Sequence, residues 1–494
     1  MSLDLSAKRN LTMLVDFYEL TMSNGYLVGG MGEQVVVFDM FFRNIPDRGG
    51  FAIFAGLEQL VNYLRGIKFT DEDIEYLRGK KIFSEEFLTY LRGFEFACDV
   101  WAFAEGTPVF PNEPMVVVRG PVIQAQLIET MLLLSINHQS LIATKAGRIS
   151  RAAGVLPVME FGSRRAQGYD AAIYGARAAY IGGCTSTSCT LAGREFGIPA
   201  VGTMAHSWVQ LFDSEYQAFE AYAKLYPDEC ILLVDTYNVM ASGIPNAIKI
   251  FDQVLAPMGR KPKAVRIDSG DIAYLSKRAR ATLDAAGYRD VKIVATGALD
   301  EYTIRDLLLQ GAKVDIFGVG EKLITSKSEP VFGGVYKLVA AMDSQGSYTP
   351  KIKLSESVHK ITTPGFKKAY RFFCKESGKA IADYIIHHDE VIDEGSPITL
   401  FDPNATWKRK EISNFSAQSL LQPVFVGGRC VYTPPPLAEV RKHCTAQTQL
   451  LWDEVTRFER PHRYYVDLSQ KLWETKQKIL LESGQMSTKG AGHV

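Results

Sequence analysis

Short apolar segments alternate with helical stretches through the middle of the chain, between residues 157 and 317. Each apolar segment has the length of a buried strand, and the segments recur at intervals of roughly 20 to 32 residues. This rhythm is typical of strand–helix units that build a parallel sheet. The segments predicted as strands are residues 157–161, 179–181, 200–202, 231–234, 264–267, 292–295 and 314–317.

The parts before and after this region have a mixed pattern. Residues 35–42 are β-rich and nearly continuous in hydrophobicity, residues 55–64 have helical spacing, and residues 124–149 predict one long, mostly buried helix. Later in the chain β-type segments return, and residues 437–481 predict a terminal helical segment. The expected domains are an α+β domain, a central α/β domain and a C-terminal domain, over residues 1–125, 126–340 and 341–494.

Polar residues follow most of the predicted strands, and their distribution distinguishes two arrangements of a parallel sheet. In a closed barrel, the ends of all strands line one mouth. An open doubly wound sheet gathers its ligand-binding residues at one switch point. Because glycine, arginine, aspartate, threonine or histidine follows most of these strands, we expect an irregular, TIM-like α/β barrel. It would pack against the α+β N-terminal domain and carry a C-terminal extension.

The composition is that of a globular protein with a large core, since 47% of the residues are hydrophobic and 22% are charged. The 55 basic and 55 acidic residues balance, which argues against a nucleic-acid scaffold or a polybasic membrane binder. An anionic ligand must therefore be met by a local cluster of residues and not by the field of the whole chain.

Several features favour a cytoplasmic protein. The first eight residues contain no apolar region of a signal peptide, and the most apolar stretch, residues 127–136, is too short to cross a bilayer. The seven cysteines are odd in number and include no close CxxC pair, which favours reduced thiols. Cys430, His443 and Cys444 lack the spacing of a standard zinc site.

Polar residues at successive strand ends are the main candidates for one site. His206 lies in a short loop after an apolar run, and Arg266 and Asp268 lie two positions apart, where a strand places them on one face. A guanidinium beside a carboxylate can hold a diphosphate and sugar hydroxyls, and Asp271 can help to carry magnesium through substrate phosphates. Taken singly, His206 also fits a plain surface histidine, and Arg266 with Asp268 also fits an internal ion pair.

Other segments suit phosphate. Arg164 comes directly after a predicted strand and offers forked donors for phosphate or carboxylate, although a surface ion pair explains it equally well. Residues 182–188 combine glycines with hydroxyl residues, which fits either a phosphate cradle without the Walker A lysine or a tight turn of small residues. Gly318 and Gly320 follow the last strand, where barrels often bind phosphate.

Two aromatic residues, Tyr18 and Phe161, have polar neighbours in the sequence. Proteins commonly hold a small heteroaromatic ring between two aromatic side chains. If these two lie close together, they can form such a sandwich. Both also fit an ordinary place in the hydrophobic core, so the sequence leaves the two interpretations open.

Six segments, in order along the chain, carry a specific pattern: residues 15–22, 161–168, 181–193, 202–207, 265–271 and 333–338. Together they resemble nicotinate phosphoribosyltransferases, the type II phosphoribosyltransferase family. The resemblance implies an irregular α/β barrel packed on an α+β domain, in a homodimer whose sites are completed across both subunits. It implies that nicotinate and phosphoribosyl diphosphate give nicotinate mononucleotide and diphosphate, with Mg²⁺ and coupled to ATP hydrolysis, as the first step of NAD synthesis from nicotinate.

The resemblance also implies roles for individual residues. His206 matches a histidine that ATP phosphorylates during turnover, and Arg266 and Asp268 match residues that handle the phosphoribosyl substrate. Asp271 would serve magnesium. The further substrate contacts that it implies are Tyr18, Phe161 and Thr203 around nicotinate, and Arg164 at a phosphate or at the pyridine ring. From the strand-end segments themselves we add Ser269, Gly270, Gly318 and Gly320 as substrate-binding candidates.

The sequence departs from the family pattern at one position of the site, and other functions have to be compared with this one. Glu321 stands where the family usually has threonine, and we do not expect a carboxylate there to contact phosphate. A nicotinamide phosphoribosyltransferase would favour an acidic residue within residues 184–189, which contain none. A quinolinate phosphoribosyltransferase would lack the phosphorylated histidine. The alternative from another class is a catalytically silent nucleotide-binding protein, and the intact His206, Arg266 and Asp268 count against it.

Overall fold

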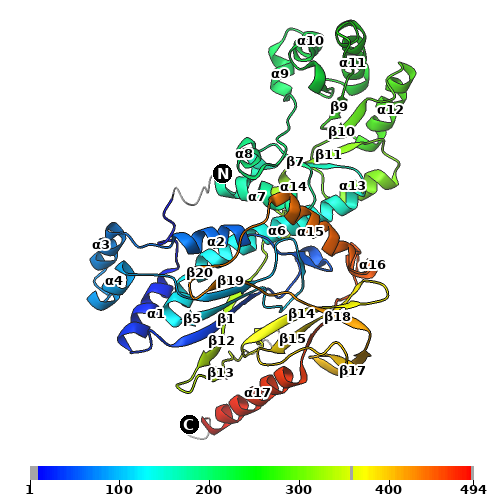
Figure 1. The fold of residues 1–494 in the computed structure, drawn as a ribbon. Coiled ribbons are helices and arrows are strands. Elements are labelled where there is room, and N and C mark those ends of the chain that lie inside the picture. The colour runs from blue at the N-terminus through cyan, green and yellow to red at the C-terminus, as the bar shows by residue number, and fades with distance from the viewer. Residues whose placement is uncertain (1–8, 356–359, 491–494) are drawn as a thin grey trace. The chain divides into compact units, whose positions relative to one another are not determined.

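The chain, in a computed structural model that describes residues 9–355 and 360–490, divides into two compact units (Figure 1). The first combines Met1–Leu141 with Val331–Val494, and the second is Ile142–Pro330. The boundaries expected near residues 125 and 340 therefore differ from those of the structure. Strand β12 (Val335–Met342) explains the difference, because it pairs with β1 (Val35–Phe41) and joins the C-terminal part to the N-terminal part. The first eight residues, on which the signal-peptide expectation rests, lie outside the described residues.

A seven-stranded antiparallel sheet organises the first unit, in the order β13-β12-β1-β5-β3-β19-β20. Val37, Val117 and Val339 pack together on this sheet and are almost fully buried. A four-stranded sheet, in the order β18-β14-β15-β21, has its own core around Phe372 and Phe415. The remaining strands of these two sheets are β3 Asp99–Ala102, β5 Val116–Pro121, β13 Tyr348–Pro350, β14 Lys367–Cys374, β15 Ala380–His387, β18 Phe415–Ser419, β19 Gln422–Val426, β20 Arg429–Cys430 and β21 Val466–Leu468.

Two-stranded pairs and helices complete the first unit. Thr70 begins α3 with a reciprocal capping box to Asp73. The two-stranded pairs join β2 (Ala52–Ile53) to β4 (Pro108–Val109) and β16 (Ile398–Asp402) to β17 (Ala405–Ile412). The helices are α1 Phe17–Val28, α2 Leu57–Gly66, α3 Asp71–Gly79, α4 Glu85–Arg92, α5 Val122–Leu127, α15 Leu437–Gln449, α16 Asp453–Thr456 and α17 Gln470–Gly490.

The elements expected in the first unit are largely present. Strand β1 and helix α2 confirm the predictions over residues 35–42 and 55–64. The single helix expected over residues 124–149 is divided at Ile128 into α5 and α6 (Glu129–Ala153). The continuous helical segment expected over residues 437–481 is wrong, because β21 lies within it and pairs in parallel with β15.

The second unit is built on a six-stranded sheet whose order is β7-β6-β11-β10-β9-β8. All neighbouring strands in it are parallel. Its central strands are buried, as expected when helices cover both faces of a parallel sheet. The strands are β6 Val158–Glu160, β7 Ser186–Thr187, β8 Ile231–Leu233, β9 Ala264–Ile267, β10 Lys292–Ala295 and β11 Ile316–Val319. The α-helices are α7 Tyr169–Ile181, α8 Thr190–Phe196, α9 His206–Leu211, α10 Glu215–Leu225, α11 Ile244–Ile250, α12 Ile272–Ala285, α13 Glu301–Leu309 and α14 Glu321–Ile324.

The structure confirms the predicted strands that became β6, β8, β9, β10 and β11. The strand expected at residues 179–181 is wrong, since these residues end the alanine-rich helix α7. The strand expected at residues 200–202 is reduced to one bridge between Ala200 and Thr187. A mixed α/β fold with a parallel sheet is therefore present. The closed barrel is not confirmed, because β7 and β8 stand at the two ends of the described ladder.

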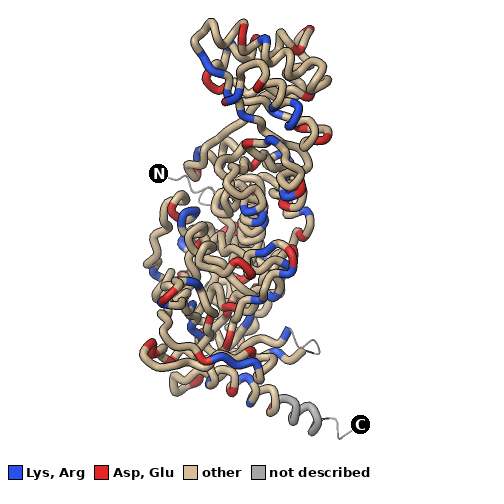
Figure 2. The backbone as a smooth tube through the Cα atoms, turned by 90° about the vertical axis from the view of Figure 1, so that its right-hand side faces the viewer, with Lys and Arg blue, Asp and Glu red and all other residues tan. Residues whose placement is uncertain are grey.

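Charged residues of both signs are interspersed along the described chain (Figure 2). This agrees with the balanced composition and leaves local clusters as the means of binding an anion. Among the described residues, no helix has the length and apolar character needed to cross a membrane.

Candidate active site

Arg266 is the centre of a polar network at the carboxyl end of β9. Its guanidinium donates to Thr296 Oγ1 at 2.9 Å, to Thr203 Oγ1 at 2.8 Å and to Asp268 Oδ1 at 2.7 Å. It thereby joins three segments that are far apart in the sequence. The side chain is mostly buried, with 15% of its surface exposed, so these hydrogen bonds hold the planar fork in one orientation.

Asp268 connects Arg266 to the histidine expected at the site. The Nε2 atom of His206 lies 3.8 Å from Asp268 Oδ2, and its Nδ1 atom lies 3.1 Å from Thr236 Oγ1. Burial alone would raise the pKa of Asp268, but the hydrogen bond from Thr296 and the charge of Arg266 outweigh it and lower that pKa. Asp268 is therefore a carboxylate, and it faces both a guanidinium and an imidazole.

The turn after Asp268 contains the other residues expected there. Ser269 donates from Oγ to Asp235 Oδ2 at 2.5 Å. Gly270 adopts a φ of +83°, a conformation that side chains rarely take. Asp271 is the N-cap of α12 and accepts from the backbone N–H of Tyr274 at 2.9 Å. The capping role occupies one oxygen of the carboxylate that the sequence assigned to magnesium.

The ends of β6 and β11 bring Phe161 and the two glycines together. A Cβ atom on Gly318 would lie 2.6 Å from Thr296 Cγ2 and 2.8 Å from Phe161 Cδ2, so any larger residue would force one of these side chains to move. A Cβ atom on Gly320 would lie 3.0 Å from the carbonyl oxygen of Phe161. Phe161 is therefore packed beside the Thr296 loop and not in an isolated part of the core.

Buried Glu160 fixes the loop that carries Phe161 and Arg164. Its carboxylate accepts hydrogen bonds from the backbone N–H of Gly162 and from Thr187 Oγ1 of β7, the latter at 2.6 Å. Arg164 itself lies in a short 3-10 turn, Ser163–Arg165, and is exposed. Its guanidinium is thus accessible to an anion.

Tyr18 and Glu321, two other positions that the sequence analysis discussed, make contacts outside the Arg266 network. Tyr18 lies on α1 in the first unit, where burial and the neighbouring Glu129 raise its pKa, and its stacking opposite Phe161 stays a prediction. Glu321 forms ion pairs with Lys327 at 2.7 Å and Arg165 at 3.8 Å. The hydrogen bond from Lys327 lowers the pKa of Glu321, so this carboxylate is charged and already occupied by cations.

The sequence did not single out three residues of this network: Asp235, Thr236 and Thr296. The first two come after β8, separated from it by Val234, and Thr296 follows β10 directly. The sequence pattern could have identified each of them, because every one is a polar residue at the end of an apolar strand segment. Asp235 Oδ1 is buried and has no hydrogen-bond partner among the described residues.

Comparison with known protein families gives a consistent result along the chain. Residues 13–137 match the nicotinate phosphoribosyltransferase N-terminal domain, residues 156–342 match the nicotinate phosphoribosyltransferase family, and residues 366–476 match its C-terminal domain. The chain belongs to the nicotinate phosphoribosyltransferase family. It is accordingly an enzyme of the phosphoribosyltransferase class.

Relatives within this family match over nearly the full length. The nicotinate phosphoribosyltransferase of Bacillus subtilis is 42% identical over 476 residues, which cover 96% of each chain. The human nicotinate phosphoribosyltransferase is 30% identical over 517 residues, covering 93% of this chain and 95% of the relative. The crystal structure of human nicotinic acid phosphoribosyltransferase superimposes with a TM-score of 0.83 at 28% identity, covering 94% of this chain and 100% of the other.

Proposed function

We propose that this enzyme converts nicotinate and phosphoribosyl diphosphate into nicotinate mononucleotide and diphosphate, with ATP hydrolysed to ADP and phosphate through a phosphorylated His206. The observation that carries the proposal is the contact network of His206, Asp268, Arg266 and Thr203 at the strand ends. Relatives that cover nearly the whole chain are named for this activity.

The chemistry requires charge management more than an attacking side chain. The nicotinate ring nitrogen forms a bond to the anomeric carbon while the bond from that carbon to the diphosphate oxygen breaks. The transition state has the character of a sugar cation and a departing anion, so positioned donors and charges supply the catalysis. Arg266 would neutralise the leaving diphosphate, and the Asp268 carboxylate would face the sugar.

The donor set fits magnesium bound mainly through substrate phosphates. Mg²⁺ prefers oxygen ligands and usually keeps one or two carboxylates with several waters. Asp235 Oδ1, a buried oxygen without a hydrogen-bond partner among the described residues, suits this role beside Ser269. Asp271 would add a carboxylate at the start of α12. When bound, the ion would add positive charge at the leaving diphosphate.

The proposal includes an irregular barrel, a homodimer with shared sites and a cytoplasmic location. A segment between β7 and β8 supports the barrel. Ala200 bridges to Thr187 at the β7 edge, while Thr203 and His206 contact Arg266 and a residue that follows β8. One short stretch of chain therefore reaches from one edge of the sheet to the other.

The reaction is tested by following mononucleotide formation from nicotinate, phosphoribosyl diphosphate and Mg²⁺, with and without ATP. We expect product from nicotinate and a higher rate when ATP is present. Faster turnover of nicotinamide than of nicotinate would contradict the substrate assignment. An absence of product under every condition would contradict the enzymatic proposal as a whole.

The phosphohistidine is tested with ATP labelled in its γ-phosphate. We expect one acid-labile phosphate on the wild-type protein and none on His206→Ala. The matched control is His462→Ala, since His462 is exposed in the first unit. Label retained by His206→Ala would exclude His206 as the acceptor.

A further inference from the structure

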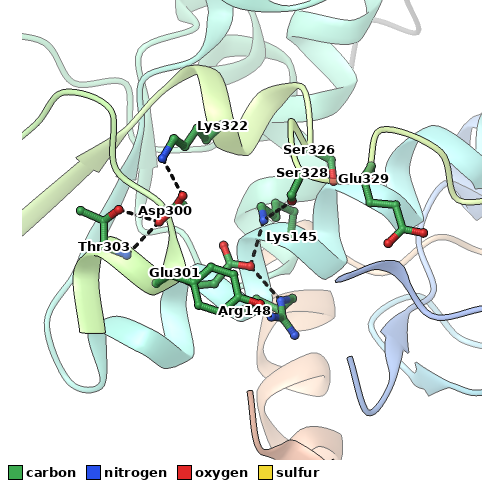
Figure 3. A network of polar contacts seen from close by, with 10 residues as sticks. Lys145, Arg148, Asp300, Glu301, Thr303, Lys322, Ser326, Ser328 and Glu329 are labelled. Atoms are coloured by element: carbon green, nitrogen blue, oxygen red, sulfur yellow. Dashed lines mark hydrogen bonds and ion pairs between the residues drawn. The ribbon is translucent and has the colours of Figure 1, made fainter. Parts of the chain in front are cut away.

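A buried ion cluster lies at the start of α13, outside the contacts assigned to substrates (Figure 3). Lys145 Nζ and Arg148 Nε of α6 each donate to the same oxygen of Glu301, Oε1, at 2.9 Å. At most 2% of any of the three side chains is exposed. A carboxylate held by two buried cations has few alternative positions, so Glu301 fixes the first turn of α13 against α6.

The preceding residue, Asp300, ties this turn to the segment after β11. One oxygen of Asp300 caps α13 by accepting from the Thr303 N–H at 2.8 Å, and the other accepts from Lys322 Nζ at 2.6 Å. Lys322 lies in α14, two residues after Gly320. In Figure 3 the Lys322 side chain points from α14 to Asp300. The loops that follow β10 and β11 are thereby joined by an ion pair.

A short link connects this ion pair to the candidate active site. Only residues 296–299 separate the end of β10 from Asp300. Thr296 holds Arg266 and Asp268, and Gly297, at a φ of +109°, approaches the carbonyl of Asp268 so closely that a Cβ atom would lie 2.6 Å from its oxygen. A displacement of the start of α13 would therefore be transmitted to Thr296 and its two partners.

We propose that Asp300, Glu301 and Lys322 are positioning residues that hold the Arg266–Asp268 pair in a fixed position relative to Gly318 and Gly320 at the end of β11. They touch no substrate in this proposal, which rests on the proposed function. They act by keeping Arg266 and Asp268 in the position that binds the diphosphate. Misplacement of such a group by about 1 Å is costly, since catalysis here depends on alignment.

The ion pair between Asp300 and Lys322 offers a test that spares the buried cluster. Asp300→Asn retains a good N-cap residue, and Lys322→Met keeps the length of the side chain without its charge. We expect KM for phosphoribosyl diphosphate to rise about fivefold in each variant and no further in the double variant. KM for nicotinate and the melting temperature should stay close to those of the wild type, and Lys322→Arg should restore KM.

The matched control is Lys292→Met, which removes the exposed ion pair to Asp315 at the opposite end of β10. It should leave KM unchanged. An unchanged KM for phosphoribosyl diphosphate in Asp300→Asn and Lys322→Met would overturn the proposal, as would effects that add fully in the double variant. A lower melting temperature with normal KM would give the Asp300–Lys322 ion pair a structural role alone, which also overturns the proposal.

A second measurement separates this inference from the proposed function. Calorimetric titration with inorganic diphosphate and Mg²⁺ measures the affinity for diphosphate without turnover. If the wild type forms no mononucleotide, the proposed function fails, and weaker diphosphate binding by Lys322→Met would still support positioning. Equal binding by wild type and Lys322→Met would overturn positioning whether or not the enzyme is active.

Discussion

The hydroxyl of Thr296 accepts a hydrogen bond from Arg266 Nε at 2.9 Å. The same hydroxyl donates to the carboxylate of Asp268, which is itself paired with Arg266. One side chain at the end of β10 therefore holds both members of an ion pair at the end of β9. This arrangement stabilises the charged form of Asp268 and leaves the guanidinium little freedom.

Thr296→Val removes the hydroxyl while nearly preserving the shape of the side chain. We expect KM for phosphoribosyl diphosphate to rise about tenfold, because the variant loses one acceptor for Arg266 and one donor to Asp268. Steady-state kinetics with varied phosphoribosyl diphosphate measure this. Thr282→Val, a half-buried position on α12 whose hydroxyl donates to the Arg278 carbonyl, serves as the control, and an equal KM in both variants would contradict the assigned role of Thr296.

Gly318→Ala tests the close packing between β11 and Phe161. The added Cβ atom would lie 2.6 Å from Thr296 Cγ2 and 2.8 Å from Phe161 Cδ2, so both neighbours must move. We expect a loss of about 1–3 kcal/mol of stability together with reduced activity. Chemical denaturation and steady-state kinetics measure the two effects.

The matched control for Gly318→Ala is Gly66→Ala, at the end of α2, where an added Cβ atom meets nothing within 4 Å. This variant should retain the wild-type stability and activity. A Gly318→Ala protein as stable and active as Gly66→Ala would show that the space beside Phe161 is larger than the structure indicates.

Much of the second unit could be predicted because its strands are buried on both faces and form apolar runs. Ile231–Leu233 and Ala264–Ile267 are examples, and each is followed by polar residues of the site. The placement of Arg266 and Asp268 at the end of β9 follows from the same logic, since parallel strands place their carboxyl ends along one edge. His206 reaches Asp268 from a segment in which the expected strand is reduced to one bridge. The contacts between these residues confirm that part of the prediction.

Other features depend on information that a local pattern does not contain. Residues 179–181 have the apolar character of a strand, but they continue the helical run of alanines in α7. In the sequence, Thr296 is distinguished only by its position at the end of an apolar segment. Its importance comes from its hydrogen bonds to two residues about thirty positions away, Arg266 and Asp268. The single bridge at Ala200 likewise reflects tertiary packing and not an intrinsic strand preference.

Arg266→Lys tests whether the geometry of the fork matters beyond its charge. A lysine keeps one positive charge but cannot reach Thr296, Thr203 and Asp268 from one planar group. We expect kcat/KM for phosphoribosyl diphosphate to fall about a hundredfold. The exposed Arg289→Lys should behave as the wild type, and a similar kcat/KM in both variants would mean that charge alone suffices.

Buried Glu19 provides a prediction about pH and stability in the first unit. Its side chain is fully buried on α1 and accepts a hydrogen bond from Thr130 Oγ1 at 2.5 Å. Burial, reinforced by the nearby Glu129, raises the pKa of Glu19 from its ordinary 4.5 to about 7. The folded protein therefore binds a proton that the unfolded chain releases, and its stability falls as the pH rises from 4.5 to 7.

Glu19→Gln removes this titration but keeps an oxygen that can accept from Thr130. Between about pH 5 and pH 8 the melting temperature of the wild type should fall further than that of Glu19→Gln, because only the wild type must place a carboxylate charge in a buried site at the higher pH. Calorimetric scans of both proteins across that range measure the difference. Exposed Glu95→Gln should follow the wild type. Parallel curves for wild type and Glu19→Gln would mean that Glu19 titrates alike in the folded and unfolded chains, which its burial beside Glu129 argues against.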